Sequence, residues 1–260
     1  MCLSAVLTVC LSDPPATVAR VEMDSYLRLI RADADLLISA ARQQLAAPVP
    51  SCPGWTVADL VEHVGHVYLH KIESIRQQRD PEPWPPPPPD GDPIDWLVAA
   101  TTDMLTELSE RGPDAPAYTW HDADQTVGFW YRRMAQETAV HRVDAELAVG
   151  RPSAIDTELA LDGVDELLDI FFAGDWSDLP KPDLTGRVGL RAADRSWLVV
   201  LEPEAVRIGQ LAGDVDAEVS GEPSELLLWL WGRLPAESVT VEGDPGAVDR
   251  LRQRLVFATQ

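Results

Sequence analysis

The chain of 260 residues carries 43 acidic and 21 basic side chains, so its formal net charge is −22 at neutral pH. Such an acidic surface repels the phosphates of nucleic acids and the headgroups of anionic lipids. The sequence also has no apolar stretch of the length that crosses a bilayer. Composition therefore excludes nucleic acid and membrane as expected partners.

The N-terminal residues and the cysteines indicate in which cellular compartment the protein is expected. Cys2, Cys10 and Cys52 are an odd set, two of them within the first ten residues, and they form neither a disulfide framework nor a metal knuckle. This usage indicates a reducing, cytoplasmic location. Residues 1–12 are apolar but lack a basic start, so we expect 1–22 to be a flexible extension or an upstream start ahead of Met23 rather than a signal peptide.

Two helices are predicted first in the chain. Apolar residues recur at helical spacing over residues 21–45 and predict a long amphipathic helix, which the proline-containing segment 47–54 ends. Thr56 begins the second helix, and Asp59 three residues later completes a pattern like a capping box. That helix runs to about Gln78.

A proline-rich segment separates these helices from two more. Residues 81–93 predict a polyproline II surface connection, with a docking site for a proline-binding partner as the alternative. A third helix is expected over residues 94–111 and a fourth over 126–149, each followed by glycine. Four helices in about 130 residues predict an up-and-down bundle whose long crossover is the proline run.

The second half of the chain has a different pattern. One more helix is predicted over residues 156–172, followed by short β-branched runs and two further helices. The expected strands are 187–190, 196–201, 205–208, 217–220 and 238–242, and the expected helices are 222–232 and 246–255. The predicted fold class is α+β in two domains: a bundle over 23–152 and a small α/β sandwich-like domain over 153–260, after the extension 1–22.

The histidines are the most informative residues for chemistry. His63, His66 and His70 lie three and four residues apart, so they share one face of the second helix. Glu137 and His141, four residues apart, share a face of the fourth helix. Because a bundle brings facing helices within side-chain reach, we expect His63 to meet Glu137 and His141 in the core.

Three such ligands are typical of a catalytic metal site, because they leave one coordination position open. Imidazole and carboxylate suit zinc but also iron, nickel or cobalt. A Glu–His pair at this spacing also occurs as an ordinary solvated helix pair, and His66 and His70 fit surface or supporting positions better than ligand positions.

Four other candidate site residues each allow two interpretations, one functional and one structural. His121 lies in a predicted loop, either near the mouth of the site or exposed. Cys52 supplies a thiolate or acts as a small packing residue. Trp55 and Trp130 either line a cofactor pocket or belong to the core.

Three segments resemble a known family. Residues 51–63, SCPGWTVADLVEH, resemble the start of the second helix in the mycothiol-dependent maleylpyruvate isomerase family. Residues 129–146, FWYRRMAQETAVHRVDAE, resemble its fourth-helix signature, and residues 160–166, ALDGVDE, the start of its C-terminal region. The resemblance extends from about Met23 to the end of the chain, and the two helix motifs together are quite specific.

The resemblance implies a fold and a ligand set. The family belongs to the DinB superfamily of four-helix bundles, and its C-terminal domain is similar to sterol carrier protein type 2. Its metal, usually zinc, is held by a histidine of the first motif and by the glutamate and histidine of the second, which correspond to His63, Glu137 and His141. The residue before the glutamate is commonly histidine in relatives and is Gln136 here, outside the ligand set.

The resemblance also implies a reaction. Family members use mycothiol, the small thiol of actinobacteria, whose metal-bound thiolate adds to the double bond of maleylpyruvate; rotation and thiolate loss give fumarylpyruvate. Other members transfer the thiol to other electrophiles. The expected function is thus a mycothiol-dependent isomerase or S-transferase acting on a small molecule, as a monomer or homodimer. The alternative is a non-catalytic metal- or ligand-binding regulatory protein.

The net charge of −22 opposes a dicarboxylate substrate, so such a site needs local positive charge. Arginines flank the expected ligands on the fourth helix, and forked guanidinium groups suit carboxylates. Arg133 and Arg142 are the candidate catalytic residues. Arg133 is the better placed of the two, at about 40° from Glu137 around the helix. An exposed arginine on an acidic surface is the alternative for each.

Overall fold

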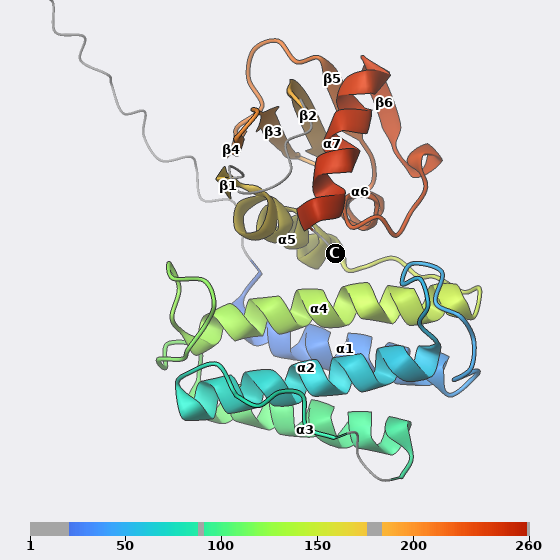
Figure 1. Cartoon of the computed structure of the whole chain (residues 1–260), viewed down its shortest axis with the longest axis vertical. Coiled ribbons are helices and arrows are strands. Elements are labelled where there is room, and N and C mark those ends of the chain that lie inside the picture. Colours follow the sequence, from blue (N-terminus) through green and yellow to red (C-terminus); the bar gives the residue numbers. More distant parts are fainter. Residues whose placement is uncertain (1–20, 88–90, 176–183, 259–260) are drawn as a thin grey trace, which may run out of the picture.

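A computed structural model describes residues 21–87, 91–175 and 184–258. Four long helices form one half of the molecule, and a mixed sheet with its own helices forms the other (Figure 1). In the part of the chain that is described, no helix has the length and apolarity needed to cross a membrane. The α+β fold class predicted from the sequence is confirmed, whereas the expected extension falls almost wholly on residues 1–20, outside the described ranges.

The first half contains α1 (Met23–Ala41), α2 (Val57–Gln77), α3 (Pro93–Arg111) and α4 (Val127–Ala148). The predicted capping box is present, because Thr56 Oγ1 accepts from the Asp59 amide and the Asp59 carboxylate accepts from the Thr56 amide. α1 ends four residues before the predicted boundary. Beyond that end, the carbonyl groups of Leu45 and Ala47 accept hydrogen bonds from the first amides of α2 instead of continuing α1. The first amides of a helix have no partners within the helix itself.

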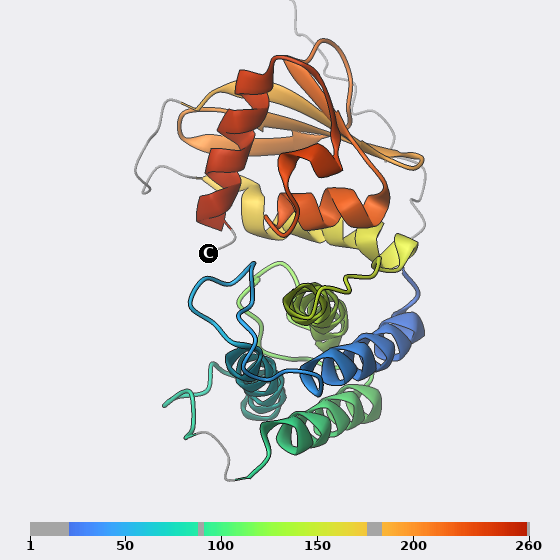
Figure 2. The same cartoon turned by 90° about the vertical axis from the view of Figure 1, so that its right-hand side faces the viewer.

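The order of the helices around the bundle places the site. α1 packs against α3 and α4, and α2 also packs against α3 and α4 (Figure 2). α2 and α4 are therefore neighbours in the bundle. The colours in Figure 1 show that α2 and α3 run in the same direction, and the proline-rich connection carries the chain back along the bundle between them. This arrangement turns one face of α2 toward α4.

The second half begins with α5 (Thr157–Glu166), which continues as a π-helix over Leu167–Phe172. The strands, in sheet order, are β1 (Gly174–Asp175), β4 (Ala205–Gly209), β3 (Arg195–Leu201), β2 (Gly186–Ala192), β5 (Ala217–Ser220) and β6 (Thr240–Gly243). β2 and β5 are parallel and the other neighbours antiparallel. The sequence missed β1, because a two-residue strand has no periodicity, and placed β6 two residues early, because Ala236–Ser238 forms a 3-10 turn.

Two helices complete this half, α6 (Pro223–Leu230) and α7 (Pro245–Ala258). α5 and α6 lie between the sheet and the bundle, and α7 lies across the sheet (Figure 2). Leucine and tryptophan side chains of α6 are buried there. The expected boundary between residues 152 and 153 stays a prediction, as does the likeness to sterol carrier protein type 2.

Helix α4 is the part of the bundle that faces the second half of the molecule, and it is buried on nearly all its faces. Polar side chains therefore meet partners on both sides. Gln136 Nε2 donates to the Leu159 carbonyl and to Asp162 Oδ2, both at 3.0 Å, and Arg132 Nε donates to Asp162 at 3.0 Å. These bonds fix α4 against α5, because a buried polar group left without a partner is costly. Gln136 thus joins the two halves and lies outside the ligand set.

Candidate metal site between the two halves

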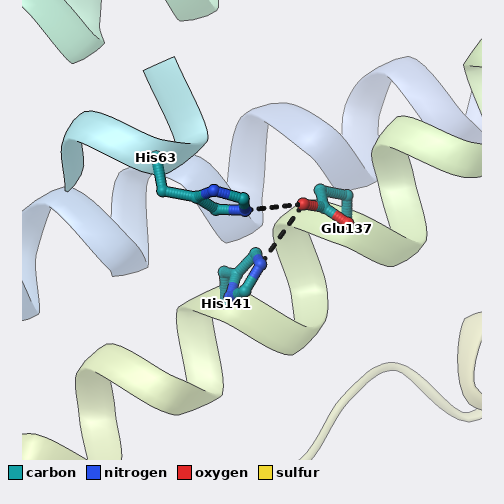
Figure 3. Close-up of side chains that lie close together, drawn as sticks. All are labelled: His63, Glu137 and His141. Carbon is teal, nitrogen blue, oxygen red and sulfur yellow. Dashed lines mark ion pairs between the residues drawn. The ribbon is translucent and has the colours of Figure 1, made fainter. Parts of the chain in front are cut away.

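His63 of α2 and Glu137 and His141 of α4 point toward one another (Figure 3). Glu137 Oε1 lies 3.4 Å from His63 Nε2 and 3.2 Å from His141 Nε2. One potential ligand atom from each residue lies within 4.8 Å of the others. Among the residues that the structure describes, these three therefore form the candidate metal site. The spacing of four places Glu137 and His141 on one face of α4, and the packing of α2 beside α4 supplies His63.

Neighbouring side chains orient two of the three. Asp144 Oδ2 lies 2.9 Å from His141 Nδ1, so the other ring nitrogen, Nε2, is the one that faces Glu137. Arg133 Nη2 donates to Glu137 Oε2 at 2.9 Å, which leaves Oε1 between the two imidazoles. The bond to Asp144 fixes the orientation of the His141 ring and raises its basicity, and the bond from Arg133 fixes the orientation of the Glu137 carboxylate.

Charge within the cluster is tightly coupled. Burial alone would raise the pKa of Glu137, but His141, His63 and Arg133 outweigh it and hold that pKa well below its ordinary value. Burial opposes a charge on His141, but Glu137 and Asp144 prevail and raise its pKa to about 9. Because a metal binds only the deprotonated ring, a cation bound at this cluster would have to displace the proton of His141.

The cluster opens into a cavity of about 1030 Å³ between the two halves of the molecule. The bundle contributes the three cluster residues together with Trp55, Val67 and Lys71, and the other half contributes Phe171, Trp231, Arg233 and Arg252. Ligand pockets commonly measure about 300–1,000 Å³. The cavity therefore has room for two small reactants beside the cluster.

The structure separates the two candidate arginines. Arg133 lines the cavity and forms ion pairs with Glu137 and with Glu166. Arg142 is 1% exposed and points to the other side of α4, where its guanidinium meets Asp33 and Glu146. It does not line the cavity. Arg142 therefore faces away from the cavity that His141, its neighbour on the helix, lines, and its catalytic role stays a prediction.

The two candidate tryptophans also differ. Trp55 lines the cavity, with its ring centroid 5.0 Å from that of His63. Trp130 is 1% exposed, donates from Nε1 to the Tyr118 carbonyl at 3.0 Å and does not line the cavity. Its position is that of a core residue, and cofactor binding by either tryptophan stays a prediction.

The remaining histidines lie outside the cluster. His66 is buried beside Trp96, with ring centroids 4.9 Å apart, and His70 is as close to Trp84 of the proline-rich connection. His121 stacks on Phe129. Cys52 lines the cavity 3.7 Å from Asp144, and burial, followed by the charge of Asp144, raises the pKa of its thiol to about 11. Cys52 is therefore a protonated thiol at neutral pH.

Sequence reasoning missed four residues of the site. The Asp144 carboxylate accepts hydrogen bonds from Ser51 and His141, and each of its oxygens also accepts one from Arg233 at 3.1 Å. Its position three residues after His141 is a signal that could have revealed it. Lys71 lies on α2 eight residues after His63, so helical spacing could have revealed it as well. Arg233 and Arg252 belong to the second half of the chain, and no spacing relates them to the cluster.

Comparison with known proteins places the chain in a family. The family model described as "Mycothiol maleylpyruvate isomerase N-terminal domain" matches residues 27–146, and the "MDMPI C-terminal domain" matches residues 158–250. No curated protein matches the sequence.

Two solved structures are similar in fold: the mycothiol-dependent maleylpyruvate isomerase and a histidine-to-alanine mutant of it. Each is 14% identical to this chain, with a TM-score of 0.56, over 85% of this chain and 93% of the other. At this identity the likeness shows the fold. Because the two domain models together span most of the sequence, the chain belongs to the family built from the mycothiol maleylpyruvate isomerase N-terminal and C-terminal domains.

Proposed function

We propose that the chain is a metal-dependent, thiol-using enzyme, and that His63, Glu137 and His141 hold its metal. One observation carries this proposal: three potential ligand atoms, from two helices, converge within 4.8 Å at a cavity shared by both domains. Two imidazoles and a carboxylate suit zinc and leave a coordination position open. The His63 side chain is 36% exposed, so the group is accessible from the cavity.

The surrounding residues fit a metal. Asp144 fixes His141 in the tautomer whose Nε2 faces the cluster, and Arg133 turns Glu137 Oε1 toward both imidazoles. When bound, a zinc ion would lower the pKa of a thiol and keep its thiolate ready at neutral pH. Trp55, Phe171 and Trp231 give the cavity apolar walls, which limit the access of water to the reacting groups.

We propose mycothiol as the thiol, on the strength of the family to which both domains belong. The reaction is then cis–trans isomerisation of an activated double bond, as in maleylpyruvate, or transfer of the thiol to another electrophile. We further propose that the protein acts in the cytoplasm of an actinobacterium, where mycothiol is made. Whether it acts as a monomer or a homodimer stays a prediction.

Elemental analysis of the purified protein tests the metal. We expect close to one zinc per chain in the wild type and a loss of nearly all of it in His63→Ala. His70→Ala is the matched control, since His70 lies on the same helix, two turns away and beside Trp84, and should leave the zinc content unchanged. Equal zinc in wild type and His63→Ala would contradict the ligand assignment.

Assays with mycothiol then separate the candidate functions. Fumarylpyruvate formed from maleylpyruvate identifies an isomerase, and conjugates formed only with other electrophiles identify an S-transferase. A zinc-loaded protein that performs neither reaction is instead the non-catalytic binding protein, in which case the enzymatic part of the proposal is wrong and the metal site stands.

A further inference from the structure

Arg133 is held between two carboxylates that belong to different halves of the molecule. Its Nη2 donates to Glu137 Oε2 of α4 at 2.9 Å, and its Nη1 donates to Glu166 Oε2 of α5. Arg133 is 5% exposed and Glu166 is 1% exposed, so this pair of charges is buried. The orientation of Glu137 therefore depends on a guanidinium that the second half of the molecule holds in place.

Aromatic side chains from the second half also confine this guanidinium. Its central carbon lies 5.2 Å from the centre of the Phe171 ring and 6.0 Å from that of the Trp231 ring. Phe171 belongs to the π-helix that begins directly after Glu166, so one short segment supplies both the carboxylate and a ring. Single π-helical turns of this kind occur frequently at functional sites.

Glu166 and Asp162, one turn apart on α5, make different kinds of contact. Asp162 accepts from Arg132 and Gln136, and these bonds join α5 to α4. In Glu166, Oε2 accepts from Arg133, whereas Oε1 is buried without a hydrogen-bond partner among the described residues. A buried ion pair is weak support for stability, because the cost of removing two charges from water can exceed their attraction. The contacts of Asp162 thus dock the helices, and those of Glu166 are directed at Arg133.

The charges of Arg133 and Glu166 sustain each other. Burial alone would lower the pKa of Arg133, but Glu166, followed by Glu137, outweighs it and raises that pKa. Burial raises the pKa of Glu166, and Arg133 is the strongest influence that opposes the rise. An arginine paired with Glu137 alone would draw on the negative charge that a metal ion needs, and it would also repel the ion. Glu166 supplies the negative charge that offsets this effect.

We propose that Glu166 is a positioning residue of the candidate metal site: it holds Arg133 and compensates its charge, so that Glu137 keeps the orientation and the charge of a ligand. Glu166 acts through Arg133 and touches neither metal nor substrate. The inference rests on the proposed function and deepens it, because it makes metal affinity depend on α5 of the second half as well as on the bundle.

The zinc affinity of the full-length protein, measured by competition with a chromophoric chelator, tests this role. Glu166→Gln keeps the shape of the side chain and removes its charge, and it should weaken zinc binding about tenfold, the lower end of the range for residues that support a metal ligand. Glu166→Asp keeps the charge but draws the carboxylate back by one methylene. Its affinity should lie between those of Glu166→Gln and the wild type, and it carries the test if Glu166→Gln does not fold.

Cobalt(II) in place of zinc gives a second readout, because its visible absorption reports the arrangement of its ligands. We expect the spectrum of Glu166→Gln to differ from that of the wild type. Asp162→Asn is the matched control, since it removes a buried carboxylate charge one turn away on the same helix and weakens the contacts between α4 and α5. It should be less stable toward urea, yet its zinc affinity per folded chain and its cobalt spectrum should equal those of the wild type.

Three results would overturn the role of Glu166. Equal zinc affinity and equal cobalt spectra in wild type and Glu166→Gln would do so and leave the metal site standing. A loss of affinity in Asp162→Asn as large as that in Glu166→Gln would attribute the effect to looser packing of the helices. A wild-type protein that binds no zinc would refute the proposed metal site together with this role.

Discussion

Helix α4 carries two clusters of buried charge that have similar residues and opposite relations to the cavity. In the first, Arg133, Glu137, His141 and Asp144 line or support the cavity. In the second, Arg142 is enclosed by Asp33, Glu146 and the 153–154 backbone, and it also contacts the Ser153 hydroxyl. Both clusters consist of an arginine with carboxylates, yet only the first presents ligand atoms to open space.

The difference shows what distinguishes a functional cluster from a structural one. Each nitrogen of the Arg142 guanidinium donates to an acceptor of the chain, and these bonds join α1, α4 and the segment leading to α5. At Glu137, by contrast, one oxygen is satisfied by Arg133 while the other faces two imidazoles across accessible space. Burial and charge are common to both clusters, so exposure of potential ligand atoms to the cavity is the feature that identifies the site.

Arg142→Met should have the largest effect and should break the second cluster. It leaves Asp33 and Glu146 buried without their cation, which costs about 3–5 kcal/mol of the free energy of unfolding. Urea denaturation measures it, with Arg207→Met as the control on an exposed ion pair, expected to change by less than about 1 kcal/mol. The zinc content per folded chain should not change. A stable Arg142→Met protein without zinc would reverse the roles that we assign to the two clusters.

Asp144→Asn should have a smaller effect, confined to the first cluster. The amide no longer fixes His141 as the carboxylate does, so zinc affinity should fall about 10- to 100-fold. Competition with a chromophoric chelator measures the affinity. Glu146→Gln is the matched change in the second cluster and should leave zinc affinity as in the wild type. Equal affinities in Asp144→Asn and wild type would show that His141 needs no such support.

The helical part of the site was accessible to sequence reasoning because helix geometry is local. A spacing of four residues places Glu137 and His141 on one face wherever α4 lies, and the predicted bundle supplied a facing His63. The positions of the helices and of most strands also follow from local pattern, from the capping box at Thr56 to the apolar run of β3.

The rest of the site depends on tertiary packing. α4 is buried on nearly all its faces, so no amphipathic pattern distinguishes the side of Arg133 from that of Arg142. Arg233 and Arg252 reach the cavity only because the second domain packs against α4.

The stability of the protein toward urea, with and without zinc, tests the central claim most directly. If His63, Glu137 and His141 hold a metal in the folded state alone, zinc at about 100 times its Kd should raise the free energy of unfolding of the wild type by about 2.7 kcal/mol. Glu137→Gln, which removes the oxygen shared by both imidazoles, should gain almost nothing. Zinc that leaves the wild type unchanged, or that stabilises Glu137→Gln equally, would contradict a metal site at this cluster.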